Sequence, residues 1–223
     1  MRGLFVTGTD TGVGKSIVAA AVCAALVARG ERVAAFKPVV TGLAEPDGDF
    51  PPDHELLAGA AGGGQPPAEV APYSYDPPLS PHLAAELADE TIEPARLVAT
   101  ARALAADADV LIAEGVGGLL VPITPGYLVR DLARDLSLPL IVAARTGLGT
   151  INHTLLTVEA ARAVGLDVAG VVMTPWPAEP ERIDRSNRAT VERLASVPVS
   201  GLGPVELDTL AARGAELPLD DWL

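Results

Sequence analysis

Cysteine and histidine are scarce in this sequence of 223 residues. The one cysteine, Cys23, lies in an apolar segment, and the three histidines lack the spacing of a zinc site: His54, His82 and His153. These counts exclude an internal disulfide and argue against a structural zinc site. We expect Cys23 to be a small buried hydrophobic side chain.

Long hydrophobic runs are also missing, although hydrophobic residues make up 49% of the chain. The longest uninterrupted apolar segment, residues 17–28, would reach only about 18 Å as a helix, against roughly 30 Å for a bilayer core. The N-terminus does not combine a charged start, a long apolar segment and a small-residue cleavage site. We therefore expect no membrane segment, no secretory signal and a cytoplasmic location.

Positive charge is in short supply, with 16 lysines and arginines against 29 aspartates and glutamates. The formal net charge of −13 opposes nonspecific attraction to nucleic acids and anionic lipids. We expect neither among the partners of this protein. If the chain binds a nucleotide, positive side chains gathered at the binding site must attract the phosphates, because the negative net charge of the whole protein repels them.

What the sequence does contain, at its start, is a glycine-rich loop between an apolar strand and a helix: MRGLFVTGTDTGVGKS, residues 1–16. Backbone N–H groups of such a loop, and of the first helical turn, point at a bound phosphate. Lys15 adds a mobile positive charge and Ser16 a hydroxyl for Mg²⁺. Thr9 replaces the first glycine of the strict G-x-x-x-x-G-K-[ST] pattern. The flanking strand and helix still favour a nucleotide site over an ordinary glycine-rich turn.

Through the rest of the chain, short apolar segments alternate with segments whose apolar residues recur with the period of a helix. This alternation predicts an α/β fold in a single P-loop NTPase-like domain, residues 1–223, with a mostly parallel sheet and helices on both faces. Ligands of such folds gather at the carboxyl ends of the strands. The expected strands are 3–7, 32–36, 109–113, 139–143 and 168–173, and the expected helices include 17–28, 95–106, 151–164 and 181–195. The polar segments that follow strand ends are 8–16, 37–41, 114–118 and 145–152.

A proline- and glycine-rich stretch, residues 44–81, interrupts this pattern. We expect a long loop that contains one short helix, residues 53–60. Asp47, Asp49 and Asp53 in this stretch are candidates for a metal-binding carboxylate. Spacing alone does not choose among them.

Charged side chains follow two of the expected strands. Lys37 would place an ammonium group beside the phosphates, where it stabilises the charge of phosphoryl transfer, and Thr41 would add a hydroxyl contact. Glu114 ends a buried strand opposite the loop serine, an arrangement that suits Mg²⁺. Gly117 and Gly118 would let the backbone approach a ligand closely. The alternatives are a surface lysine and a carboxylate that only caps a turn.

Three later segments also follow strand ends. Residues 146–153 lead into a helix whose free N–H groups suit a substrate carboxylate. The alternative is that Thr150 or Asn152 is an ordinary N-cap. The turns at 173–177 and 201–205 follow the last two strands and are placed to hold a nucleobase.

Five motifs together resemble the dethiobiotin synthetase family in order and spacing: GTDTGVGKS (8–16), KPVVTG (37–42), SPHLAAE (80–86), EGVGGLLVP (114–122) and GLGTINHT (147–154). The resemblance covers most of the chain. It implies an ATP- and Mg²⁺-dependent cyclo-ligase of biotin biosynthesis, which closes a ureido ring on 7,8-diaminononanoate (7,8-diaminopelargonate) with CO₂ through a carbamate and a carbamic–phosphoric anhydride. The products are dethiobiotin, ADP and phosphate. The resemblance further implies a homodimer with the substrate near the subunit boundary.

The resemblance also implies roles for individual residues. The catalytic residues would be Lys37, Lys15 and Thr11, and the metal ligands would be Ser16, Asp53 and Glu114. Substrate contacts would come from Thr41, Lys37, Gly118, Thr150, Ile151 and Asn152. Nucleotide contacts would come from Gly12, Val13, Gly14, Lys15, Ser16, Ile17, Asp53, Glu114, Gly115, Val116, Gly117, Thr174, Pro175, Pro204, Val205 and Glu206.

Two positions deserve separate expectations. Thr174 stands where many relatives carry asparagine to read the base, and a hydroxyl lacks the paired donor and acceptor of an amide. We therefore expect weak selectivity for adenine. Asp49 remains a rival of Asp53 as metal ligand, and we favour Asp53 because it starts the expected short helix.

A P-loop switch ATPase of the partitioning or septum-positioning kind is the competing interpretation, since it shares the expected fold. Such proteins usually carry a signature lysine early in the loop, where Asp10 stands here. Many of the septum-positioning type also end in a basic amphipathic helix. Residues 217–223 contain Asp220 and Asp221 and no basic residue, which argues against docking on a membrane.

Overall fold

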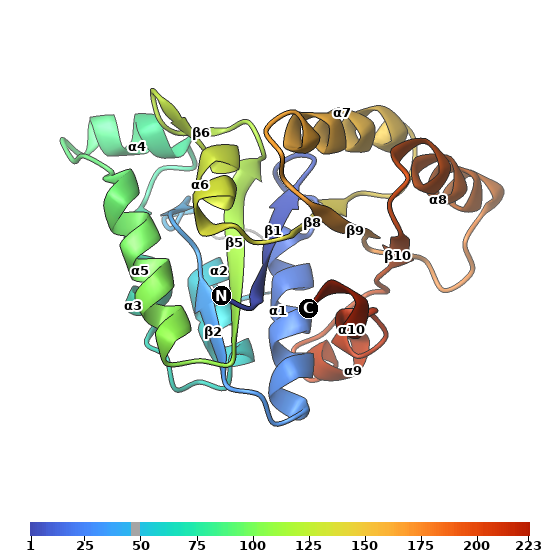
Figure 1. Cartoon of the computed structure of the whole chain (residues 1–223), viewed down its shortest axis with the longest axis horizontal. Helices are drawn as coiled ribbons and strands as arrows, with labels where there is room; N and C mark the ends of the chain where they lie inside the picture. Colours follow the sequence, from blue (N-terminus) through green and yellow to red (C-terminus); the bar gives the residue numbers. More distant parts are fainter. Residues whose placement is uncertain (46–49) are drawn as a thin grey trace.

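A central sheet of six parallel strands organises the computed structural model, which describes residues 1–45 and 50–223 (Figure 1). The strand order is β10-β9-β8-β1-β5-β2. Because all six strands run in the same direction, their carboxyl ends meet at one edge of the sheet. The strands are β1 (Gly3–Gly8), β2 (Val33–Phe36), β5 (Val110–Gly118), β8 (Leu140–Ala144), β9 (Val168–Met173) and β10 (Val199–Gly201).

Helices cover both faces of this sheet, which confirms the predicted fold class (Figure 1). One face carries α1 (Lys15–Ala28), α2 (Asp53–Ala60), α3 (Pro67–Val70), α9 (Leu210–Gly214) and α10 (Leu219–Trp222). The other carries α4 (Pro81–Leu87), α5 (Pro94–Ala106), α6 (Val129–Leu136), α7 (Thr150–Arg162) and α8 (Arg182–Ala195). The side chains of β1 alternate between the two cores, with Phe5 in one and Leu4 and Val6 in the other. Within the described residues, no helix is both long and apolar enough to cross a bilayer.

The stretch 44–81 contains more regular structure than predicted. The short helix expected at 53–60 is present as α2, but α3 and the strand β4 (Ser74–Tyr75) follow it. β4 pairs in parallel with β3 (Val40–Thr41). The expectation that 53–60 is the one helix of this stretch was wrong because Pro67 and Pro81 stand in the first turns of two further helices, α3 and α4. Proline is favourable there, since its missing N–H group has no helical partner to lose.

Strand β5 runs five residues past its predicted end at residue 113. The expected turn at 114–118 instead stays paired with β1, with Glu114 opposite Val6 and, after a register shift in the ladder, Gly118 opposite Gly8. Glycine is required at Gly115, where a Cβ would lie 2.8 Å from Val129 Cγ1. Glu114 therefore lies inside a strand, and the alternative that it caps a turn is wrong. A short antiparallel hairpin follows, formed by β6 (Pro122–Thr124) and β7 (Tyr127–Leu128).

Helix α9 packs directly on α1, as Figure 1 shows for the segments in red and blue. A Cβ on Gly214 would lie 1.9 Å from the carbonyl oxygen of Ala21. We expect Gly214→Ala to lower the free energy of unfolding by about 3 kcal/mol through overpacking, as measured by urea unfolding. Gly126→Ala is the control, because nothing lies within 4 Å of the added atom. Equal stability of the two variants would contradict the close packing of these helices.

Candidate active site

The glycine-rich loop joins β1 to α1 at the carboxyl edge of the sheet. Gly12 and the N-cap Gly14 have φ of 70° and 86°, in the left-handed region that favours glycine. No side chain caps α1, so its first N–H groups are available to a phosphate. Lys15 Nζ donates a hydrogen bond to the carbonyl oxygen of Asp10 at 2.9 Å. A Cβ on Gly8 would lie 2.9 Å from the lysine stem, so the absence of a side chain there makes room for Lys15.

Four polar side chains meet beside this loop. Lys37 Nζ donates to Glu114 Oε1 at 2.6 Å and pairs with Asp53 Oδ2 at 2.9 Å. Ser16 Oγ donates to the same Glu114 oxygen at 2.9 Å. The side chains of Lys37 and Glu114 are 3% and 0% exposed, whereas that of Asp53 is 42% exposed. The alternative of a surface lysine at position 37 is therefore wrong.

Sheet pairing explains why Lys37 and Glu114 meet. Phe36 of β2 lies opposite Ala113 of β5. The next residues on the two parallel strands, Lys37 and Glu114, are consequently neighbours. The backbone N–H of Lys37 donates to the carbonyl oxygen of Val70 at 2.9 Å, which fixes the chain where it leaves β2.

Burial and paired charges shift the pKa values of these groups. Burial by itself would lower the pKa of Lys37, but the Glu114 and Asp53 carboxylates raise it, so the ammonium group stays charged. Burial would raise the pKa of Asp53, yet Lys37 outweighs this effect and lowers it. For Glu114, burial outweighs the attraction of Lys37 and raises the pKa. Burial lowers the pKa of Lys15, against the opposing effect of Glu114.

The oxygen donors of this group fit Mg²⁺. Glu114 Oε2 is buried and has no hydrogen-bond partner among the described residues. Together with Asp53 and the Ser16 hydroxyl it offers hard oxygen ligands, to which Mg²⁺ adds several waters. In residues 1–45 and 50–223, no three His, Cys, Asp or Glu side chains gather around one metal position. The other candidates from the sequence, Asp47 and Asp49, lie outside the described residues.

An open cavity of about 450 Å³ lies between the glycine loop, the segment after β5 and helix α7. Thr11 and Gly118, both predicted to act on the substrate, line it. Its lining also includes side chains for which no role was predicted: the exposed Leu120 after β5, and His153 and the exposed Leu156 on α7. His153 stands within the GLGTINHT motif, so a signal for this part of the lining was present.

Helix α7 begins at the same edge with Gly149 as its N-cap. The alternative that Thr150 or Asn152 is the N-cap is therefore wrong. Thr150 is 1% exposed, and its Oγ1 has no hydrogen-bond partner among the described residues. Asn187 of α8 donates through Nδ2 to the carbonyl oxygen of Gly147 at 2.7 Å and so anchors the preceding loop. No sequence motif pointed to Asn187.

The two turns predicted to hold a base lie side by side. The backbone N–H of Trp176, after β9, donates to the carbonyl oxygen of Leu202, after β10, at 2.7 Å. Thr174 is buried, and its Cγ2 would lie 2.6 Å from a Cβ on Gly14. The first turn therefore contacts the glycine loop, while residues 204–206 of the second turn remain at the surface.

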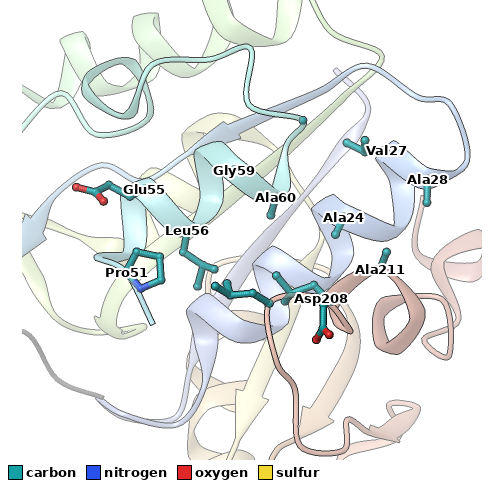
Figure 2. Close-up of a pocket in the computed structure, with 13 residues that line it drawn as sticks. Ala24, Val27, Ala28, Pro51, Glu55, Leu56, Gly59, Ala60, Asp208 and Ala211 are labelled. Atoms are coloured by element: carbon teal, nitrogen blue, oxygen red, sulfur yellow. The ribbon is translucent and has the colours of Figure 1, made fainter. Parts of the chain in front are cut away.

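A further cavity, of about 540 Å³, lies between α1, α2 and the segment that leads into α9 (Figure 2). Its lining consists mainly of small and apolar side chains, such as Ala24, Leu56 and Ala211. Neither the glycine loop nor the Lys37 group contributes to it. The polar residues of the candidate active site therefore lie outside this cavity, at the carboxyl edge of the sheet.

The glycine loop on a parallel sheet defines a P-loop nucleotide-binding protein. A family model described as an AAA domain matches residues 2–212. The structure of a ParA family ATPase from Chlorobium tepidum TLS has a TM-score of 0.54 at 14% identity, covering 96% of this chain and 89% of that one. The structure of apo McdA from Cyanthece has a TM-score of 0.53 at 13% identity, covering 100% and 95%. At these identities the likeness shows the fold alone.

Curated relatives are much more similar in sequence. ATP-dependent dethiobiotin synthetase BioD of Anaeromyxobacter dehalogenans (strain 2CP-C) is 44% identical over 93% of this chain and 92% of its own length. The protein of the same name from Anoxybacillus flavithermus is 39% identical over 90% of each chain. That from Bacillus subtilis (strain 168) is 34% identical over 92% and 87%. The chain belongs to the dethiobiotin synthetase family, which confirms the resemblance of its five motifs.

Proposed function

We propose that this protein is an ATP-dependent dethiobiotin synthetase of biotin biosynthesis, working as one catalytic domain over residues 1–223. It closes a ureido ring on 7,8-diaminononanoate with CO₂ and converts ATP to ADP and phosphate. One observation carries this assignment: the buried contact of Lys37 with Glu114, which also accepts a hydrogen bond from Ser16 of the glycine loop. An ammonium group and a metal-binding carboxylate thus meet where the terminal phosphate of ATP would lie.

The glycine loop and the first turn of α1 bind the phosphates of ATP in this proposal. Lys15 exchanges its contact with the Asp10 carbonyl for a phosphate oxygen. Ser16, Asp53 and Glu114 would hold Mg²⁺, which when bound supplies positive charge that neutralises phosphate oxygens. The turns at Thr174 and at residues 204–206 flank the base.

The diamine reacts beside this phosphate. One amine adds to CO₂ to give a carbamate and a proton, and a carbamate oxygen then attacks the γ-phosphorus as ADP leaves. The second amine attacks the carbonyl carbon and releases phosphate, which closes the ring. Lys15 and Lys37 stabilise the negative charge on the carbamate and phosphoryl oxygens, while Thr11 and Thr41 orient the substrate.

The aliphatic chain of the diamine fits the cavity walled by Leu120 and Leu156. We place its carboxylate at the free N–H groups of an α7 N-terminus, at residues 150–152, contributed by a second subunit. Leu148, just before α7, is 88% exposed, and Leu156, on α7, is 56% exposed. Two large apolar side chains at the surface support burial of this face in a homodimer. We also propose that the enzyme works in the cytoplasm, where its ATP is available.

Phosphate release tests the proposed function directly. Purified protein with ATP, Mg²⁺ and bicarbonate should release phosphate only when the diamine is added, because its carbamate is the nucleophile. Nonanoate, which lacks both amines, is the matched control and should give no release. Hydrolysis that proceeds without the diamine, and is unchanged by it, would instead support the switch ATPase, whose case now rests on the fold alone.

Selectivity among nucleotides should be weak because of Thr174. One hydroxyl provides a single hydrogen bond worth about 1 kcal/mol, less than the two that an amide offers to a base. We expect the kcat/KM values for ATP, CTP and GTP to lie within about tenfold of one another, when turnover is compared side by side. A preference for ATP of more than a hundredfold would show that other groups read the base.

A further inference from the structure

The Lys37 ammonium group occupies the place where the carboxylates of the metal site converge. Its nitrogen lies 2.6 Å from Glu114 Oε1 and 2.9 Å from Asp53 Oδ2. Ser16 Oγ lies 2.9 Å from the same glutamate oxygen. Two of the three residues assigned to Mg²⁺ therefore contact a cation that the chain itself provides, and the third bonds to the same glutamate oxygen.

Charge balance in the site points the same way. Two carboxylates, Asp53 and Glu114, are matched by two ammonium groups, Lys15 and Lys37, so these four side chains together offer little net attraction to a divalent cation. A metal coordinated by Glu114 Oε1 would also lie against the ammonium nitrogen, since Mg²⁺ needs oxygens at about 2.0–2.1 Å. The two cations would repel each other in a place that water does not screen.

We propose that Lys37 is the resident cation of the nucleotide-free enzyme and excludes the metal until a nucleotide arrives. The inference rests on the proposed function, which assigns the metal to these carboxylates. The phosphates of the nucleotide give the ammonium group a new partner and vacate the position between Glu114 and Asp53. The flexible stem of lysine permits this movement, while the backbone of Lys37 stays bonded to Val70. Glu114 Oε2, which has no partner among the described residues, is ready for the incoming metal.

Lys15 offers a matched control for this idea. Lys37→Met and Lys15→Met each remove one positive charge from the same site. Only Lys37→Met vacates the carboxylates, because Lys15 Nζ is bonded to the carbonyl oxygen of Asp10 instead. A purely electrostatic effect would make the two variants alike, whereas occupancy by Lys37 would separate them.

Binding of Mn²⁺ to the nucleotide-free protein, followed by the electron spin resonance of free Mn²⁺, tests the proposal. We expect Lys37→Met to bind Mn²⁺ at least tenfold more tightly than wild type and Lys15→Met. Adding Glu114→Gln to Lys37→Met should abolish that gain. Equal affinities of the two lysine variants, or no gain in Lys37→Met, would overturn the proposal. The measurement needs neither diamine nor turnover, so its result is separate from that of the proposed function.

The wild-type protein provides a second test, in which a conservative variant serves only to assign the signals. The chain contains two lysines, Lys15 and Lys37, so protein labelled with ¹³C at lysine Cε gives two side-chain signals. Lys15→Arg identifies which signal belongs to which residue. The Lys37 signal should shift on addition of Mg²⁺ with the non-hydrolysable β,γ-methylene analogue of ATP and stay in place with Mg²⁺ alone. A shift of the same size with Mg²⁺ alone, or none with Mg²⁺ and the analogue, would refute the exclusion.

Discussion

Replacing Lys37 with methionine is expected to slow diamine-dependent phosphate release by about 10³-fold, the loss that follows removal of one preorganised group at a site of developing charge. Methionine keeps much of the volume of the stem and none of the charge. Lys37 is 3% exposed, so water cannot replace the effect of its charge on the phosphoryl oxygens. ATP affinity should be retained, because the glycine loop and Lys15 are unchanged. The kcat for phosphate release and the Kd of ATP from titration check these two expectations separately.

Arg32→Met is the control for removing a positive charge. Arg32 is 69% exposed and pairs with Asp109 at 2.7 Å, before β2 and away from the loop. Its replacement should leave kcat unchanged. A kcat near that of wild type in Lys37→Met would remove Lys37 from the transfer step. A large loss of ATP affinity with unchanged kcat would make it a binding residue instead.

The positions of Lys37 and Glu114 show which features of the site can be predicted from the sequence and which cannot. Strands that are buried on both faces consist of continuous apolar residues, which can be recognised in the sequence. For this reason the bounds predicted for β1, β2, β8 and β9 agree with the structure to within one residue at each end. The rule that ligands gather at carboxyl ends then places both side chains on one edge. Their direct contact needs the strand order, with β2 beside β5, and spacing along the chain does not contain that order.

The end of β5 and the role of Asn187 were missed for physical reasons. Glycines at 115, 117 and 118 are typical of a turn, yet the segment stays paired with β1 across a register shift, within which Gly117 has a φ of 60°. Asn187 reaches the Gly147 carbonyl across 40 positions of the sequence, which no local pattern records. One compositional signal does point to the site. Of the 16 basic residues only two are lysines, and both are buried beside the glycine loop.

Substitutions at the buried pair of Lys37 and Glu114 are expected to have a large effect on the free energy of unfolding. Glu114→Leu leaves the buried ammonium group with Asp53, which water partly screens, as its one charged partner, beside a long hydrogen bond of 3.4 Å to the carbonyl oxygen of Gly115. We expect this variant to lose about 3 kcal/mol of unfolding free energy, because removal of one partner leaves a buried charge uncompensated. Lys37→Met should cost less, since burial already raises the pKa of Glu114 and the carboxyl group can bind a proton.

The double variant, Lys37→Met with Glu114→Leu, decides whether charge or packing is responsible. Two apolar side chains of similar volume leave no buried charge, so much of the loss should be recovered. We expect a coupling free energy of about 2 kcal/mol from the four unfolding curves in urea at neutral pH. The same cycle on the exposed pair of Arg32 and Asp109 should give less than about 1 kcal/mol. Additive losses at the buried pair would mean that Lys37 and Glu114 contribute to stability independently, and that their contact serves the reaction rather than the fold.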